Sequence, residues 1–184
     1  NVSIIGATGY SGIELIRLLE NHPQFQIASL HSSSMAGHYI HEENPHLLHI
    51  TQMLKEIDPI KIAKESSIVF LGTPSGVSAK LSPQLIEAGL TVIDLSGDLR
   101  LKNPESYKTW YKKDPAPIQS LEQAVYGLSE WNTEQIKSAT LIANPGCFPT
   151  ASLLGLAPVC EQQWCDGNSI IIDAKSGVSG AGRT

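Results

Sequence analysis

The sequence predicts an α/β fold built on a doubly wound parallel sheet. Short apolar runs alternate along the chain with segments whose apolar residues recur at helical spacing, which is typical of successive βαβ units. The first apolar run, residues 2–5, also ends in a glycine-rich turn that leads directly into a helical pattern. A helix that crosses between two strands of one sheet makes those strands parallel, so a parallel sheet is expected.

Each element is predicted from its own local pattern. Residues 2–5 form the first strand, a helix follows until Pro23 interrupts it, and residues 26–31 form the second strand. The polar, His-rich residues 32–50 are expected to form a loop. The consecutive isoleucines within 169–174 favour a strand that is buried on both faces. The other expected elements are a helical or mixed stretch at 52–65, strands at 68–71, 91–95 and 141–143, and helices at 78–88, 104–112, 130–137 and 148–160.

Composition argues against several classes of protein. The 184 residues carry a formal net charge of −5, and the 13 Lys and Arg residues are scattered, which argues against a nucleic-acid partner. The sequence has no apolar run of about 18 residues and no charged-then-apolar leader, so neither a membrane partner nor a signal peptide is expected. A cytoplasmic location is predicted. Three cysteines without a secretory signal favour free thiols over a disulfide framework.

The turn after the first strand carries a dinucleotide-binding pattern. Gly6, Gly9 and Gly12 are spaced as G-x-x-G-x-x-G between a strand and a helix. Glycines there let the backbone approach a pyrophosphate, while the helix N-terminus supplies unpaired N–H groups and a partial positive charge. A tight turn without a ligand is the alternative. The position before a crossover helix favours a Rossmann-like dinucleotide domain.

The end of the second strand indicates which dinucleotide is bound. An NAD-selecting fold usually places Asp or Glu there to bind the ribose 2′-hydroxyl. This sequence has Ser32, Ser33 and Ser34, whose hydroxyls do not repel a 2′-phosphate, so NADP is favoured. The nearest cationic candidates for that phosphate are His31 and His38.

Cys147 is the candidate nucleophile. Pro145 and Gly146 force a turn after a buried strand, and Pro149 suits the first turn of the helix that follows. A helix N-terminus favours the thiolate, which is the form that attacks carbonyl groups. A small apolar residue that merely fills a corner is the alternative. Cys160 and Cys165 lie late in a helix and in a loop, and neither is expected to be catalytic.

A dinucleotide turn and a poised thiol in one chain indicate hydride chemistry on an acyl group through a thioester. The motifs that carry this chemistry also resemble a known family, the N-acetyl-γ-glutamyl-phosphate reductases of the aspartate-semialdehyde dehydrogenase superfamily. The resemblance covers the whole chain. The turn around the cysteine resembles these reductases more than their semialdehyde-dehydrogenase cousins. The matching stretches, in order, are residues 6–12, 70–74, 92–101, 126–128, 144–150 and 176–183.

The resemblance implies roles for residues of this chain. Cys147 is expected to be the nucleophile, and Arg100 to hold substrate or phosphate through its guanidinium group. A loop ion pair of Arg100 with Asp98 or Asp94 is the alternative. The other residues expected at the substrate are Ser96, Asn144 and Ser179. The residues expected to line the NADP site are Gly6, Thr8, Gly9, Tyr10, Ser11, Gly12, Ser32, Ser33, Ser34, Thr73, Pro74, Ser176, Gly177 and Gly180.

The activity implied by the resemblance is reduction of N-acetyl-γ-glutamyl phosphate to N-acetylglutamate 5-semialdehyde, with NADPH and release of phosphate, in arginine biosynthesis. Two alternatives stay open: the same chemistry on a carrier-bound aminoadipyl phosphate in lysine biosynthesis, and a non-catalytic dinucleotide-binding module. No metal is expected, because the histidines between 38 and 49 lack Cys or carboxylate partners at ligand spacing. The family's general acid–base histidine would lie beyond residue 184, since no histidine follows His49.

The resemblance also implies two domains. Residues 1–146 would form the NADP-binding Rossmann-like domain, and residues 147–184 would begin an α+β catalytic and dimerisation domain. The chain opens inside an apolar run and closes just after a glycine-rich stretch, so both ends are expected to be cuts within a longer protein. That longer protein is expected to form a homo-oligomer, a dimer or a tetramer.

Overall fold

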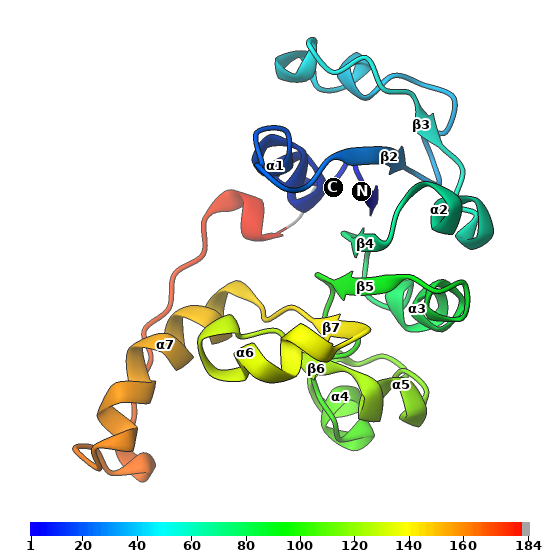
Figure 1. The fold of residues 1–184 in the computed structure, drawn as a ribbon. Coiled ribbons are helices and arrows are strands. Elements are labelled where there is room, and N and C mark those ends of the chain that lie inside the picture. Colours follow the sequence, from blue (N-terminus) through cyan, green and yellow to red (C-terminus); the bar gives the residue numbers. More distant parts are fainter. Residues whose placement is uncertain (182–184) are drawn as a thin grey trace.

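The computed structural model describes residues 1–181 and places helices on both faces of one parallel sheet (Figure 1). The seven strands lie in the order β3-β2-β1-β4-β5-β7-β6, and all neighbouring pairs are parallel. The chain starts in the middle, moves outward to β3, and returns to β4, so the winding reverses between β1 and β4. The predicted doubly wound sheet is confirmed. The strands are β1 (Val2–Ile5), β2 (Ile27–His31), β3 (Leu54–Lys55), β4 (Ile68–Leu71), β5 (Thr91–Asp94), β6 (Val125–Tyr126) and β7 (Leu141–Ala143).

The helices connect the strands as crossovers. Helix α1 lies on one face of the sheet, and α2 and α3 lie on the other (Figure 1). The helices are α1 (Tyr10–Leu19), α2 (Pro59–Glu65), α3 (Ser78–Glu87), α4 (Pro104–Tyr111), α5 (Ile118–Gln123), α6 (Ser129–Ser138) and α7 (Cys147–Glu161). Short 3-10 turns are η1 (Ile40–Glu42), η2 (Pro45–Leu47), η3 (Gly167–Ser169) and η4 (Val178–Ala181).

Two apolar clusters hold these layers together, one on each face of the sheet. The alternation of side chains along a strand sends Ile4 to the cluster beneath α1 and Ile5 to the cluster beneath α2 and α3. Each fully buried Ile or Leu side chain stabilises the fold by about 1.5–3 kcal/mol. The cluster beneath α1 includes Val2, Ile4, Ile16, Leu19, Leu30 and Leu54. The opposite cluster includes Ile5, Ile62, Val69, Leu71, Leu85, Val92, Leu121 and Leu141.

Local sequence signals explain where two helices begin. Asp58 precedes Pro59, and its side chain accepts hydrogen bonds from the N–H groups of Ile60 and Lys61 at the start of α2. Asn103 precedes Pro104 and caps α4 in the same way. A capping side chain followed by proline at the first helical position satisfies N–H groups that the helix itself leaves unpaired.

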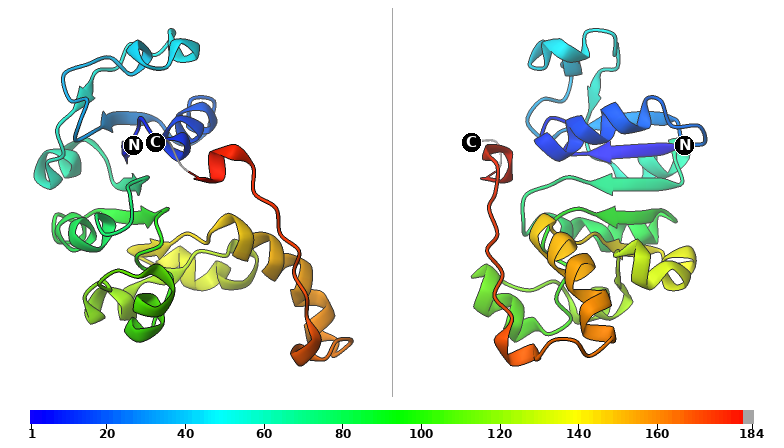
Figure 2. Two further views of the ribbon diagram at one scale, coloured as in Figure 1. Left: turned by 180° about the vertical axis from the view of Figure 1, so that it is seen from behind. Right: turned by 90° about the vertical axis from the view of Figure 1, so that its left-hand side faces the viewer.

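The predicted strand at 169–174 is wrong. Residues 170–177 belong to no helix or strand, and Ile171 is 94% exposed. Consecutive isoleucines favour a buried strand only where a neighbouring strand pairs with their backbone, and the sheet of the described residues offers them none. Figure 2 shows this segment as an extended stretch that runs from beyond the end of α7 back toward α1.

Five shorter elements also differ from the sequence-based expectation. Residues 32–50, predicted as a loop, contain η1 and η2. Strands β3 and β6 are only two residues long, and helix α5 has six. Such short elements carry no periodicity of their own and depend on the neighbours that pair with them or cover them.

The β1–α1 turn crosses the β4–α3 turn at backbone contact. Gly6 has a φ of +82°, and a Cβ added there would lie 2.4 Å from the carbonyl oxygen of Gly72. A Cβ at Gly12 would lie 2.3 Å from the oxygen of Gly6. The Gly72 N–H donates to the Ile5 carbonyl at 2.8 Å. A side chain at Gly6 would therefore push the two turns apart, and one at Gly12 would push α1 away from residues 6 and 7 of its own turn.

A buried carboxylate joins the loop after β5 to the start of α3. Asp98 is fully buried and accepts hydrogen bonds from the Gly76 N–H at 2.7 Å, the Ala79 N–H at 3.0 Å and the Tyr107 hydroxyl at 2.8 Å. Burial, and then the hydrogen bond to Asp98, raise the pKa of Tyr107 above its usual range. Three segments of the chain thus converge on one side chain.

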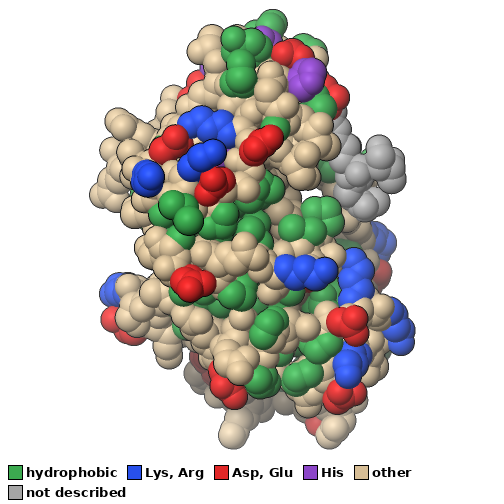
Figure 3. All heavy atoms as spheres, turned by 90° about the vertical axis from the view of Figure 1, so that its right-hand side faces the viewer, with side chains coloured by type: hydrophobic (Ala, Val, Ile, Leu, Met, Phe, Trp, Pro, Cys, Tyr) green, Lys and Arg blue, Asp and Glu red, His purple; other side chains and the backbone are tan. Residues whose placement is uncertain are grey.

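The surface carries both signs of charge. Figure 3 views the face that α2 and α3 cover, where basic and acidic side chains are interspersed rather than gathered by sign. Lys55 and Glu65, for example, form an ion pair at 2.8 Å. Among residues 1–181, no helix is long and apolar enough to cross a membrane.

Replacement of Gly12 by alanine is expected to destabilise the full-length protein by about 1–3 kcal/mol, because the new Cβ overlaps the Gly6 carbonyl. Gly155→Ala in α7 is the matched control, since nothing lies within 4 Å of its added Cβ. That change should be neutral or should stabilise the helix by about 0.5–1 kcal/mol. Urea unfolding of both variants provides the measurement. Equal midpoints would contradict the close contact of Gly12 with Gly6 inside the β1–α1 turn.

Tyr107→Phe is expected to cost about 1.5–3 kcal/mol, because it removes a donor from the buried Asp98 carboxylate. Tyr111→Phe is the control. Its ring stacks on Tyr107 at 4.6 Å between centroids, but no hydrogen bond of its hydroxyl is found among residues 1–181. Thermal unfolding of the two variants should separate them, and a Tyr111→Phe loss as large as that of Tyr107→Phe would argue against the role of Asp98.

Candidate active site

A cleft of about 910 Å³ lies at the carboxyl ends of β1, β2 and β4. It occupies the point where the winding of the sheet reverses, which is where open α/β sheets bind their ligands. Of the residues predicted at the cofactor, the cleft is lined by Gly6, Thr8, Gly9, Tyr10, Ser11, Ser32, Ser33, Ser34, Thr73, Pro74 and Gly180. The predicted substrate residue Ser179 lines it as well, together with Ile5, Ile57, Gly72 and Val77, which the sequence did not single out.

Three of the predicted cofactor residues lie outside the lining. Gly12 is buried behind the turn, where its missing side chain makes room for Gly6. Ser176 and Gly177 precede the part of the chain that reaches the cleft, and the Ser176 hydroxyl donates to the Gly177 carbonyl at 3.2 Å. Two members of the matching stretch, Gly182 and Arg183, lie outside the described residues.

The start of α1 suits an anion. Gly9 is the N-cap of this helix and contributes no side chain to cap it. The first N–H groups of a helix have no partner within the helix, and together with the helix dipole they favour a phosphate group. Tyr10 and Ser11, which open α1, both line the cleft.

The end of β2 offers hydroxyls rather than charges. Ser33 and Ser34 are exposed at the cleft, while the Ser32 hydroxyl accepts from the Met35 N–H at 3.3 Å. His31 turns into the fold, where its ring bonds the Glu56 carbonyl at 2.8 Å and the Ser29 hydroxyl at 2.9 Å. Burial lowers the pKa of His31, so this side chain is neutral near pH 7.

His38, the second cationic candidate, is engaged elsewhere. Its Nδ1 pairs with the Glu42 carboxylate at 2.9 Å. Of the polar side chains predicted near the 2′-phosphate, only the serines line the cleft, and neither histidine does.

Cys147 is the first residue of α7, and a turn of three residues separates it from β7. Gly146 is the N-cap and has no side chain to cap the helix, and the thiol is exposed. Register pairs Leu71 with Asp94 and Asp94 with Ala143, so β4, β5 and β7 end at the same edge of the sheet. The thiol and the cleft therefore share the carboxyl edge, with β7 roughly 14 Å from β1 along the sheet.

Arg100 holds the turn that precedes Cys147. Its Nε donates to the Asn144 carbonyl and its Nη2 to the Leu95 carbonyl, each at 2.8 Å. A Cβ at Gly146 would lie 2.9 Å from Nη1, so the guanidinium group lies directly against the turn. The side chain of Asn144 is turned back on its own turn, where its amide donates to the Pro145 carbonyl at 3.1 Å.

The alternative ion pair of Arg100 with an aspartate is not found among the described residues. Asp94 instead accepts from the Ser96 N–H and the Ser96 hydroxyl, both at 2.9 Å. Burial raises the pKa of Asp94. Ser96, predicted at the substrate, is 8% exposed, and its bonds to Asp94 stabilise the loop after β5. Sequence reasoning missed that Asp98 binds the start of α3 and Tyr107, because contacts between separate segments of the chain leave no local pattern.

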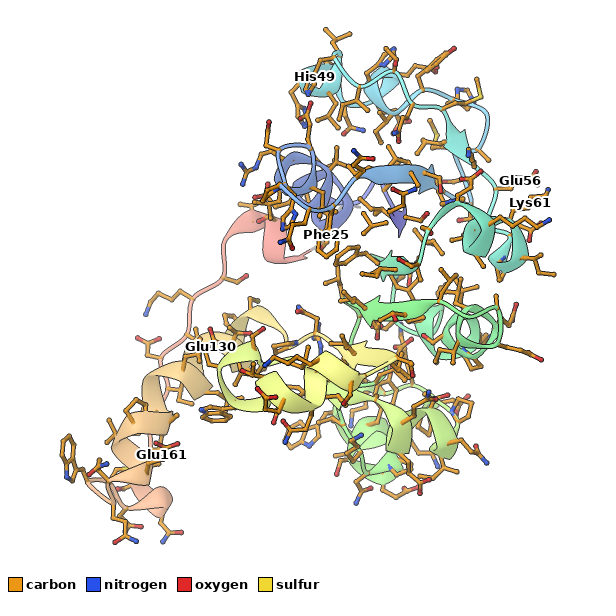
Figure 4. The ribbon with its side chains drawn as sticks, viewed as in Figure 1. Phe25, His49, Glu56, Lys61, Glu130 and Glu161 are labelled. Carbon is orange, nitrogen blue, oxygen red and sulfur yellow. The ribbon has the colours of Figure 1, made fainter. Side chains whose placement is uncertain are left out.

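The histidines lie around α1, β2 and the connection from β2 to β3, whereas Cys147 follows β7 near the other edge of the sheet. All six fall between His22 and His49, and His49 pairs with Glu20 at 2.8 Å. Figure 4 shows His49 at one end of the molecule and Glu161, at the end of α7, at the other. Among the residues that the structure describes, no group of three or more His, Cys, Asp or Glu side chains could hold a metal ion.

Known proteins match this chain in sequence over its whole length. Residues 147–184 match the dimerisation domain of semialdehyde dehydrogenases. The chain is 59% identical over 184 residues to a protein of Bacillus cytotoxicus named N-acetyl-gamma-glutamyl-phosphate reductase, covering 100% of this chain and 53% of that relative. A reductase of the same name from Brevibacillus brevis is 56% identical over 183 residues, covering 99% of this chain and 53% of the relative. The chain thus spans about half the length of these curated relatives.

A solved structure shows the same fold. Aspartate semialdehyde dehydrogenase with NADP from Candida albicans superposes with a TM-score of 0.60 at 22% identity, over 88% of this chain and 46% of that chain. Residues 1–139 match the family described as semialdehyde dehydrogenase, NAD binding domain. This chain therefore belongs to the semialdehyde dehydrogenase family, whose dinucleotide-binding domain it carries.

Proposed function

We propose that the protein reduces N-acetyl-γ-glutamyl phosphate to N-acetylglutamate 5-semialdehyde, with NADPH and release of phosphate. The observation that supports this proposal is an exposed thiol, Cys147, at the start of a helix on the same sheet edge as a dinucleotide cleft. The choice of substrate is based on the relative named N-acetyl-gamma-glutamyl-phosphate reductase, to which the chain is 59% identical.

In this reaction the Cys147 thiolate attacks the acyl carbon, and the bond from that carbon to the phosphate oxygen breaks. Charge builds on the carbonyl oxygen during the attack. The N–H groups of Cys147 and Phe148, in the first turn of α7, have no helical partner and can stabilise that charge. Phosphate leaves, and a thioester on Cys147 remains.

The cofactor would lie in the cleft, with its pyrophosphate at the turn of residues 6–12 and its 2′-phosphate at Ser33 and Ser34. When bound, its nicotinamide would supply the hydride that reduces the thioester carbon. The bond from that carbon to the Cys147 sulfur then breaks, which releases the aldehyde and restores the Cys147 thiolate. Thr73, Pro74 and Val77, together with Ser179 and Gly180, close the remaining sides of the cleft.

Arg100 contributes by positioning the nucleophile. Its Nε bonds the turn of Asn144 to Gly146 and its Nη2 bonds the Leu95 carbonyl, which leaves Nη1 as the group that can reach a substrate phosphate. Asn144 and Ser96 would act by shaping the same turn and loop, because their polar side-chain groups bond neighbouring residues.

The domain organisation follows from the same assignment. Residues 1–146 would form the NADP-binding domain, and residues 147–184 would open the catalytic domain, through which the full-length protein would assemble into a dimer or tetramer. Apolar side chains exposed from α7 onward, such as Phe148, Ile171 and Val178, are what an intersubunit or interdomain surface would cover. A cytoplasmic location would suit such a biosynthetic enzyme.

A steady-state assay of the full-length protein tests the function. N-acetylglutamate 5-semialdehyde, phosphate and NADP should give phosphate-dependent NADPH formation. A preference for a carrier-bound aminoadipate semialdehyde would overturn the substrate, and the absence of any turnover with either aldehyde would favour a non-catalytic dinucleotide-binding module.

Cys147→Ser is expected to lower kcat by roughly 10³-fold or more, because a hydroxyl is a far weaker nucleophile than a thiolate. The affinity for NADPH, measured by fluorescence titration, should stay unchanged. Cys160→Ser is the matched control and should keep wild-type kcat in reducing buffer. Substantial activity in Cys147→Ser would rule out the thioester route.

NADPH is expected to bind more tightly than NADH, because the end of β2 carries Ser33 where a carboxylate would repel the 2′-phosphate. Ser33→Asp should weaken NADPH binding by roughly tenfold or more, since like charges would then face each other. Ser33→Asn, which has the same shape without the charge, is the control. If Ser33→Asp leaves the ratio of the two dissociation constants unchanged, the 2′-phosphate lies elsewhere.

A further inference from the structure

Two cysteines meet at the end of α7. Cys160 lies in the last turn of the helix and Cys165 in the loop that follows. Their sulfur atoms are 3.3 Å apart, and both cysteines are free thiols. A disulfide bond is about 2.05 Å long, so the sulfurs need to approach each other by roughly 1 Å to form one.

A specific chain reversal brings these thiols together. In a continuous helix, residues five apart are separated by roughly 7.5 Å along the axis and point to different sides. Here Gln163 adopts a left-handed φ of 57° and stops the helix. The Gln163 N–H donates to the Cys160 carbonyl and the Trp164 N–H to the Val159 carbonyl, each at 3.0 Å. These two bonds hold the reversal that returns Cys165 to Cys160.

Both thiols are open to small molecules and are separate from the proposed nucleophile. Cys160 is exposed, Cys165 is half-buried, and neighbouring Trp164 is 77% exposed. The end of α7, where Figure 4 labels Glu161, projects away from the sheet. Cys160 lies thirteen positions along the helix from Cys147, which corresponds to roughly 20 Å.

We propose that Cys160 and Cys165 form a dithiol modification site, which small-molecule disulfides oxidise to an intramolecular disulfide while Cys147 stays reduced. The close approach of the two sulfurs and their common exposure carry this proposal. It does not depend on the proposed reductase activity.

The chemistry is a two-step thiol–disulfide exchange. The Cys165 thiolate attacks one sulfur of a small-molecule disulfide, which forms a mixed disulfide and releases one thiolate. Cys160 then loses its proton to solvent and attacks the Cys165 sulfur, which releases the second thiolate. Both released thiolates take up the protons that the cysteines lost. The two cysteine sulfurs are oxidised, and the two sulfurs of the reagent are reduced.

The order of the steps follows from the hydrogen bond between the thiols. This hydrogen bond, in which either sulfur can be the donor, raises the pKa of Cys160, so Cys160 keeps its proton longer and enters in the second step. The disulfide would fix the chain reversal at Gln163. Beyond this reversal, the chain continues to the segment that reaches the cleft. The last turn of the helix could then no longer fray.

The test uses the full-length protein in buffers of fixed ratios of reduced to oxidised glutathione. Acid quenching, alkylation with N-ethylmaleimide and peptide mapping then report the state of each cysteine. Cys160 and Cys165 should lose alkylation together and appear as one linked peptide, lighter by two hydrogens, while Cys147 stays alkylated. Cys165→Ser should leave Cys160 alkylated or glutathionylated, and Cys160→Ser should do the same for Cys165.

A comparison in denaturant separates the fold from mere proximity in sequence. The equilibrium constant for linking the two cysteines should fall by roughly tenfold or more in urea, because the reversal that aligns the sulfurs is then lost. An unchanged constant would overturn the proposal. Separate glutathionylation of the two thiols, disulfides between chains, or oxidation of Cys147 before this pair would overturn it as well.

Discussion

The ligand-binding edge of the sheet depends on the backbone crossing of the β1–α1 and β4–α3 turns. Gly6 and Gly72 approach so closely that a Cβ at Gly6 would lie 2.4 Å from the Gly72 carbonyl oxygen. The crossing places the start of α1 and the loop at Thr73 on two sides of one cleft. It also brings β1 and β4 together at the point where the winding of the sheet reverses. The ligand site at this edge exists only because no side chains stand between the two turns.

Polar side chains that are buried or partly buried hold the loops along the rest of the carboxyl edge of the sheet. Asp98 joins the loop after β5 to the start of α3, and Arg100 joins the same loop to the turn before Cys147. Both residues act largely on backbone groups, which would otherwise remain unpaired in a buried loop region. The position of the cleft loop and that of the thiol thus depend on one short stretch of sequence after β5.

The end of α7 illustrates how a loop can bring together side chains that helical geometry would separate. A single left-handed residue, Gln163, reverses the chain and places two thiols in contact. The same reversal directs the following segment back toward α1, where Ser179 and Gly180 reach the cleft. Local backbone conformation therefore links this helix end to a distant part of the molecule.

Much of the fold could be predicted from the sequence, because its longer elements have strong local signals. The glycine turn at 6–12, the buried run at 68–71 and the helix start at Cys147 are all defined by residues adjacent in the chain. The short strands β3 and β6 could not be predicted, because their stability comes from pairing with β2 and β7. The isoleucines at 170–172 led to a wrong strand prediction for the same reason, because a run of apolar residues does not show whether a partner strand is present.

The sequence by itself determined the α/β class, the dinucleotide turn and the placement of one cysteine at a helix start, since each depends on neighbours within a few residues. Only the tertiary structure decided which polar side chains face the cleft. Ser33 and Ser34 do, whereas His31 turns inward, and Ser96 and Arg100 mainly hold loops. The physical reason is that a polar side chain bonds whichever group the fold brings within about 3 Å. Those groups lie up to 44 positions away in the chain, as Asn144 does from Arg100.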